Sequence, residues 1–126
     1  MITADTKLIY TDLSYSIRGA VFNVYNNLGF GHKEQVYQEA LAQEFKEKNI
    51  HVGNYRPDFV VDQKIILELK AVEFIPKTYG QQLLHYLKST NYQLGLLINF
   101  GAPKLYIKRL IWTLDSCKSV TNLRKS

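Results

Sequence analysis

Two carboxylates and a lysine lie close together in an apolar stretch between Arg56 and Val72. Asp58 precedes one short apolar run, and Glu68 and Lys70 interrupt the next. An ionised carboxylate inside an apolar strand costs on the order of several kcal/mol unless a cation or hydrogen bonds offset the lost hydration. Because Glu68 and Lys70 are two residues apart, a strand places them on one face, about 6 to 7 Å apart along the chain. This pattern predicts a divalent-metal site beside a proton-handling lysine; the alternative is an ion pair on a surface hairpin.

A short polar run separates the two apolar runs, which predicts two antiparallel strands joined by a tight turn. A two-residue loop would pair Val61 with Lys64 and put Asp58 on the face opposite Glu68. A three-residue loop would pair Val61 with Ile65 and set Asp58 directly across from Glu68, with about 4.5 to 5.5 Å between their Cβ atoms. Local turn propensity leaves both loops open. The three-residue loop is favoured because it would let Asp58 and Glu68 share one metal ion.

These residues resemble a known family. Pro57-Asp58 followed by Glu68-Leu69-Lys70 is similar to the signature of the PD-(D/E)xK nuclease superfamily. The run Gly31-His32-Lys33-Glu34-Gln35-Val36-Tyr37 resembles the signature of the GxxExxY family within that superfamily. The resemblance covers about residues 11–111. Two further blocks are similar to later parts of the same pattern, namely residues 82–88 and 95–101.

The resemblance implies hydrolysis of nucleic-acid phosphodiester bonds with Mg²⁺ or Mn²⁺ as cofactor, and DNA is favoured over RNA as the substrate. It implies that Asp58, Glu68 and the Leu69 carbonyl hold the metal ion, with Glu34 bound directly or through water. Such an all-oxygen ligand set suits Mg²⁺. The other implied site residues are Lys70 and Gln82 as catalytic residues, and Tyr37, Tyr86 and Lys88 as substrate-binding residues.

Two of the implied roles have plainer alternatives. Glu34 lies at the start of an expected helix, where a carboxylate also complements the helix dipole. Gln82 and Tyr86 are four residues apart and share a helix face, which could equally be a solvated face. A different class of function is an inactive nuclease-fold module that binds nucleic acid or a protein partner.

One departure from the family pattern lies before the first carboxylate. Members carry an additional strand and hairpin there, whereas only residues 49–55 intervene between the second helix and the Pro57-Asp58 strand. The sheet is therefore expected to have one strand fewer than the sheet of other family members. A second copy of the chain could supply the missing strand, which would make a homodimer through sheet edges.

The composition fits a single globular domain. The chain has 126 residues, 46% hydrophobic and 21% charged, with a formal net charge of +5 that favours a polyanionic partner. It has no apolar run long enough to predict a membrane span, and no signal-peptide pattern. The single cysteine, Cys117, cannot form an internal disulfide, which fits a reducing cytoplasm.

The periodicity and the resemblance together predict an α/β fold, a three-layer restriction-endonuclease-like core with a mixed central sheet flanked by helices. Residues 1–10 are expected to form an N-terminal arm, 11–114 the nuclease-like domain, and 115–126 a flexible basic tail. The strands on either side of the third helix are expected to be parallel. The expected helices cover about 11–28, 33–48 and 78–89, and the expected strands 59–61, 65–67, 94–100 and 105–112.

Overall fold

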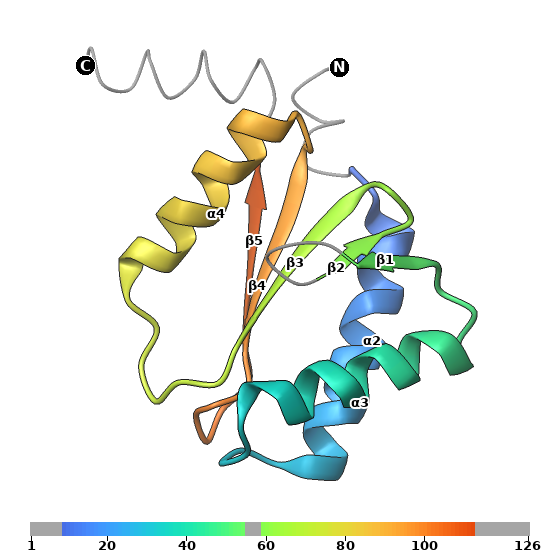
Figure 1. Cartoon of the computed structure of the whole chain (residues 1–126), viewed down its shortest axis with the longest axis vertical. Helices are drawn as coiled ribbons and strands as arrows, with labels where there is room; N and C mark the ends of the chain where they lie inside the picture. Colours follow the sequence, from blue (N-terminus) through green and yellow to red (C-terminus); the bar gives the residue numbers. More distant parts are fainter. Residues whose placement is uncertain (1–8, 55–58, 113–126) are drawn as a thin grey trace.

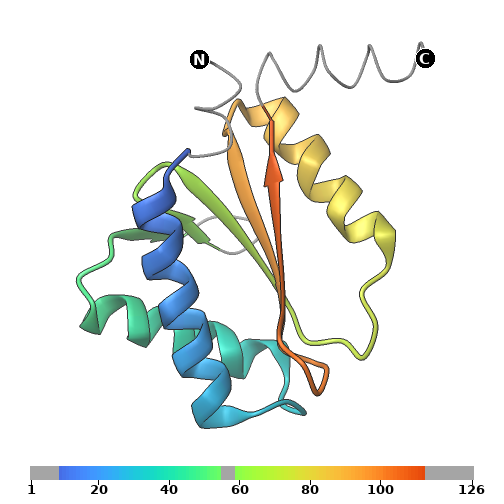
Figure 2. The same cartoon turned by 180° about the vertical axis from the view of Figure 1, so that it is seen from behind.

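The computed structural model describes residues 9–54 and 59–112, which form three layers (Figure 1). Two helices cover one face of a mixed sheet and a third covers the other, as the reverse view also shows (Figure 2). Most of the expected arm, the expected tail and Asp58 lie outside the described residues. The predicted α/β three-layer architecture is confirmed. No helix of the described ranges is long and apolar enough to cross a membrane.

In the described part of the chain the sheet has five strands, in the order β1-β2-β3-β4-β5. β3 and β4 are parallel, as predicted, and the other neighbouring pairs are antiparallel. The strands are β1 (Val52–Asn54), β2 (Phe59–Val61), β3 (Ile65–Lys70), β4 (Leu94–Asn99) and β5 (Tyr106–Ile111).

The helices α2 (Thr11–Leu28) and α3 (Glu34–Glu47) pack together on one face of the sheet. Their apolar residues recur every three or four positions, so each helix presents one continuous buried stripe. Gly29 ends α2. Its N–H makes the last helical bond, to the Tyr25 carbonyl, and its positive φ of 69° turns the following chain away from the helix axis. The buried stripe residues are Ile17, Ala20, Val21 and Val24 on α2, and Tyr37, Leu41 and Phe45 on α3.

The helix α4 (Lys77–Thr90) covers the opposite face of the sheet. Its Leu83 and Leu87 are fully buried against Ile66 of β3 and Leu97 of β4. The sheet is thus covered on both sides, and β4 is buried along its whole length. This explains why the sequence of β4 is apolar up to its last residue, Asn99.

One local expectation is wrong. The sequence predicted no strand over residues 52–54, yet β1 pairs with β2 through three residue pairs. Three residues carry no periodicity of their own, so this strand depends on pairing with its neighbour. At the start of α2, Tyr10 occupies the N-cap position, with φ 53° and no described side-chain capping bond.

The ends of β3 and β4 are joined by the side chain of Asn99, which is only 2% exposed. Its amide Nδ2 donates to the Val72 carbonyl at 2.9 Å, and its Oδ1 accepts from the N–H groups of Val72 and Gly101, both at 3.0 Å. The side chain therefore replaces a backbone partner just beyond the last strand pair. A Cβ atom at Gly101 would collide with the backbone of Ala71 and Val72.

We expect Gly101→Ala to destabilise the protein by about 3 kcal/mol, because the added methyl group forces apart two backbone segments that the Asn99 side chain holds together. Urea unfolding measures this change. Gly19→Ala is the matched control. Gly19 lies on α2 with no atom near its Cβ position, so alanine there should stabilise by about 0.5 to 1 kcal/mol. If alanine changed the free energy of unfolding equally at both positions, the close approach of Gly101 to the backbone of Ala71 and Val72 would be contradicted.

Candidate active site

The β2–β3 hairpin has the three-residue loop. Val61 pairs with Ile65, Phe59 pairs with Leu67, and the Lys64 N–H donates to the Val61 carbonyl at 2.9 Å. Local turn propensity left two registers open, and the observed one is the register that the sharing of one ion favoured. The position of Asp58 stays a prediction, because that residue lies outside the described ranges.

Glu68 lies on the α4 side of the sheet. Its neighbours Leu67 and Leu69 belong to the core beneath α2 and α3, so the alternation of the strand turns Glu68 to the opposite face. The residue is only 7% exposed. A buried carboxylate in a strand of isoleucine and leucine needs a charged or hydrogen-bonding partner to offset its lost hydration.

That partner is Lys70, whose Nζ lies 3.5 Å from Glu68 Oε2. The same ammonium lies 4.7 Å from the centre of the Tyr79 ring, in the first turn of α4. The Lys70 ammonium is thus held between a carboxylate of its own strand and an aromatic ring of the covering helix. Its side chain keeps 26% of its surface exposed, so this cation can still meet a ligand.

Gln82 and Tyr86 extend the same stripe of α4. They follow Tyr79 by three and seven residues, which places all three on one side of the helix. Both line a groove of about 580 Å³ that runs along α4. Gln82 is exposed, while Tyr86 is half-buried against the core beneath α4. Lys88 is exposed, and its Nζ lies 5.5 Å from the centre of the Trp112 ring.

The first turn of α3 is anchored at the end of β3. Tyr37 stacks on Phe100 with 4.5 Å between ring centres, and the Phe100 N–H donates to the Lys70 carbonyl at 2.9 Å. Glu34 lies one turn earlier, half-buried, and accepts a bond from Gln38 Nε2 at 3.2 Å.

Tyr37, expected to bind substrate, has no exposed surface. Its hydroxyl donates to the Gly29 carbonyl at 2.6 Å and accepts from the His32 N–H at 3.3 Å. The residue therefore fixes the turn that leads into α3 rather than presenting a surface to a substrate. Glu34 follows directly from this turn.

The basic residues of the edge strand β5 divide between the two faces. Leu97 pairs with both Glu68 and Lys108, so Lys108 lies in the same row on the α4 side, and its Nζ approaches the Cβ position of Gly80 at 3.9 Å. Arg109 lies on the other face, where it donates to the Ile9 carbonyl at 3.2 Å. Burial, and then the charge of Arg18, lowers the pKa of Arg109.

The metal donors that the family resemblance implies are oxygen atoms. Glu68 and Glu34 would supply carboxylates, and Leu69, whose side chain is buried on the other face, could contribute only its carbonyl. Among residues 9–54 and 59–112 no three His, Cys, Asp or Glu side chains are grouped closely enough to hold a metal ion. The donor chemistry fits a hard cation such as Mg²⁺, and the remaining candidate ligand, Asp58, lies outside these ranges.

Two contacts at this position were not foreseen from the sequence. The sequence assigned no role to Tyr79, although the Lys70 ammonium lies over its ring. Asn99 was read as part of an apolar run, although it joins the ends of β3 and β4. A polar amide closing a run of apolar residues is a signal for the second contact, whereas the first depends on how α4 docks.

Comparison with protein families gives one match. The family described as the PD-(D/E)XK nuclease superfamily matches residues 11–54 and 48–110, which together span most of the chain. The two matched segments overlap at residues 48–54. Searches of curated proteins and of solved structures returned no match.

We expect burial to strengthen the Glu68–Lys70 pair, which a double-mutant cycle of Glu68→Gln and Lys70→Met measures by urea unfolding. The matched control is the exposed pair of Asp62 and Lys64, whose 3.4 Å separation is close to the 3.5 Å of the first pair. We expect a coupling of about 1 to 2 kcal/mol for the partly buried pair. The exposed pair should give about 0.3 kcal/mol and lose it in 1 M NaCl. Equal couplings with equal salt dependence would contradict this account.

Proposed function

The chain belongs to the PD-(D/E)XK nuclease superfamily, and on this basis we propose that it is a divalent-metal-dependent nuclease that hydrolyses phosphodiester bonds, with DNA as the favoured substrate. The observation that carries the proposal is the pair of Glu68 and Lys70. A carboxylate that is 7% exposed is retained in a strand of apolar residues, together with an ammonium on the same face. Leucine at residue 68 would avoid the cost of burying this charge, so the carboxylate is better explained by function than by folding.

Asp58 is the second proposed carboxylate. Pairing of Phe59 with Leu67 is the register in which one more antiparallel pair would bring residue 58 opposite Glu68. Cross-strand partners lie about 4.5 to 5.5 Å apart at Cβ, which is close enough to share one ion. Asp58, Glu68 and the Leu69 carbonyl would hold Mg²⁺ or Mn²⁺, with Glu34 bound directly or through water. The bound ion would polarise the phosphate and lower the pKa of a bound water.

Lys70 has the position required of a proton-handling or charge-neutralising group. Its ammonium is kept by Glu68 and Tyr79 on the face that carries the carboxylate, yet it retains exposed surface. In the proposed role the ammonium orients the attacking water and offsets the negative charge that develops on the phosphate, whereas deprotonation of that water would require the neutral amine. Gln82 lies one turn beyond Tyr79 and is proposed to position Lys70.

We further propose that the chain is a GxxExxY-type member of the superfamily. The support is the arrangement of the Gly31–Tyr37 signature. Tyr37 fixes the turn before α3 and stacks on Phe100 at the end of β3, and Glu34 is the first residue of that helix. In this role the tyrosine is a positioning residue, and Glu34 is the one that approaches the metal. Tyr86 and Lys88 of α4 are proposed to contact the nucleic acid.

The variant Glu68→Gln tests the proposal, because it removes the charge that binds the metal while keeping the side-chain shape. We expect wild-type protein to cleave labelled DNA in Mg²⁺ and this variant to show no cleavage. In thermal unfolding, Mg²⁺ at ten times its Kd should stabilise the wild type by about 1.4 kcal/mol and the variant by almost nothing. Labelled RNA in parallel reactions tests the preference for DNA.

Glu39→Gln is the control, because Glu39 is an exposed carboxylate of α3 that bonds only to a neighbouring glutamine among the described contacts. This variant should cleave DNA and respond to Mg²⁺ as the wild type does. The nuclease proposal would be refuted if Mg²⁺ and Mn²⁺ stabilised neither the wild type nor Glu68→Gln, and if neither protein cleaved DNA or RNA. Nucleic-acid binding that persisted in EDTA would then support the inactive binding module.

A further inference from the structure

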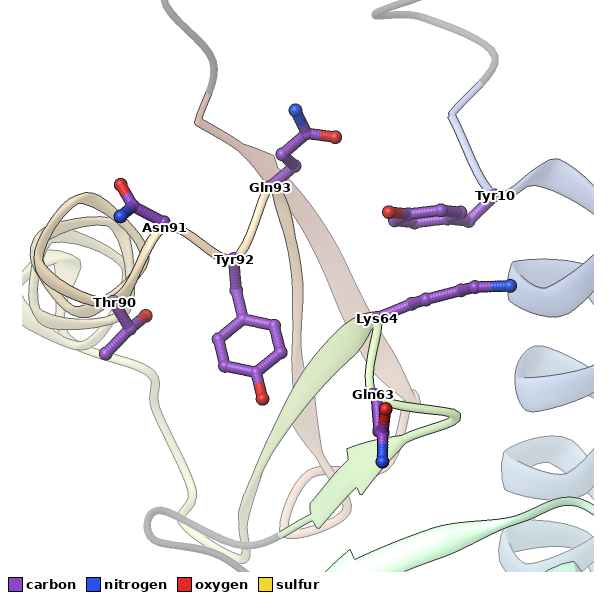
Figure 3. A pocket seen from close by; sticks show the side chains of 7 residues that line it. All are labelled: Tyr10, Gln63, Lys64, Thr90, Asn91, Tyr92 and Gln93. Carbon is purple, nitrogen blue, oxygen red and sulfur yellow. The ribbon is translucent and has the colours of Figure 1, made fainter.

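A polar pocket of about 650 Å³ lies at the end of the sheet where β3 and β4 begin (Figure 3). Three separate segments line it: the residue before α2, the β2–β3 turn, and the connection from α4 to β4. The proposed nuclease site lies at the other end of β3, where Lys70 is the last residue of the strand. It does not include this pocket. The main lining residues of the pocket are Tyr10, Gln63, Lys64, Asn91, Tyr92 and Gln93.

Two lining residues adopt a backbone conformation that their side chains disfavour. Tyr10 has φ 53° and Gln63 has φ 55°, both in the left-handed region. For a bulky residue such as tyrosine this conformation is a genuine outlier that costs about 1 to 3 kcal/mol. The Arg109 guanidinium holds the preceding carbonyl of Ile9 at 3.2 Å, and the Lys64 ammonium lies 5.7 Å from the Tyr10 ring centre. The strained tyrosine is therefore held in place from two sides.

The chemistry of the lining matches an unpaired nucleotide. Tyr10 and Tyr92 supply aromatic rings, on which bases stack. Gln63 and Gln93 are exposed amides that can both donate to and accept from the edge of a base. Lys64, whose side chain is 48% exposed, supplies a cation for a phosphate. A base inside a duplex is already stacked and paired, so only an unpaired nucleotide could use all three kinds of contact.

We infer that this pocket binds an unpaired nucleotide of a nucleic acid, and the choice of ligand rests on the nuclease function proposed above. Lys64 precedes Glu68 by four strand residues, which corresponds to about 13 Å along β3. The preferred substrate would then be a single strand, or a duplex with a single-stranded end, that contacts the pocket at one end of β3 and the carboxylates near the other. Blunt duplexes would lack the pocket contact.

The test is binding in EDTA, measured by fluorescence anisotropy with a labelled single strand, a blunt duplex and a duplex with a single-stranded overhang. We expect the single strand and the overhang to bind more tightly than the blunt duplex. Gln63→Gly should weaken single-strand binding about three-fold or more, since it removes one amide. It also relieves the left-handed strain, so its melting temperature should stay the same or rise. Tyr92→Leu should weaken single-strand binding about ten-fold.

Lys64→Ala and Lys46→Ala form a matched pair, because both lysines are exposed and each change removes one positive charge. Lys46→Ala measures the effect of losing one positive charge. Lys64→Ala should weaken single-strand binding by more than that. The inference is overturned if the blunt duplex binds as tightly as the single strand, or if folded Gln63→Gly binds like the wild type. Competition by dAMP or dTMP as strong as by the oligonucleotide would identify a free nucleotide and also overturn it. Since EDTA prevents metal-dependent cleavage, these results are independent of whether Glu68 supports hydrolysis.

Discussion

The structure depends on one strand, β3, which is paired on both edges and covered on both faces. It forms six residue pairs with β4 and three with β2. One face packs under α2 and α3 and the other under α4. A strand in this position cannot easily tolerate a charge, yet β3 carries Glu68 and Lys70. The need to compensate that buried carboxylate explains the ion pair within the strand and the contact of the lysine with α4.

The elements around the end of β3 give these groups a rigid support. Asn99 and Gly101 hold β4 against the chain that leaves β3, and Phe100 links that point to Tyr37 in the first turn of α3. Glu34 and Tyr79 each lie in the first turn of a helix, on α3 and α4 respectively. Side chains on regular elements, locked by buried neighbours, keep a defined geometry more closely than side chains on loops. The proposed nuclease site would therefore be built largely in advance of substrate binding.

The two ends of β3 differ in the way they are built. At its carboxyl end the Glu68 and Lys70 charges are paired and partly buried, and the Tyr37 hydroxyl and the Asn99 amide make internal hydrogen bonds. At its amino end, polar side chains surround a pocket and the backbone is held in left-handed conformations at Tyr10 and Gln63. Hydrolysis of a phosphodiester needs charged groups held in fixed positions, as at the carboxyl end of β3. Recognition of a base needs polar side chains around an open pocket, as at the amino end.

The sequence by itself determined the three helices, four of the five described strands, the parallel pairing of β3 with β4, and the placement of Glu68 and Lys70 on one face. The elements and the shared face follow from local periodicity, because apolar spacing of three to four or of two residues reports which face is buried. The parallel pairing follows from the strand–helix–strand order. The tertiary structure settled what local turn propensity left open in the β2–β3 hairpin, which has the three-residue loop that a shared ion favoured. It also decided the existence of β1, the bonds of the Tyr37 hydroxyl to Gly29 and His32, the contact of Lys70 with Tyr79 and the pocket around Tyr10. Each of these depends on separate segments of the chain meeting through packing, and local propensity carries no information about which distant side chain will fill a given space.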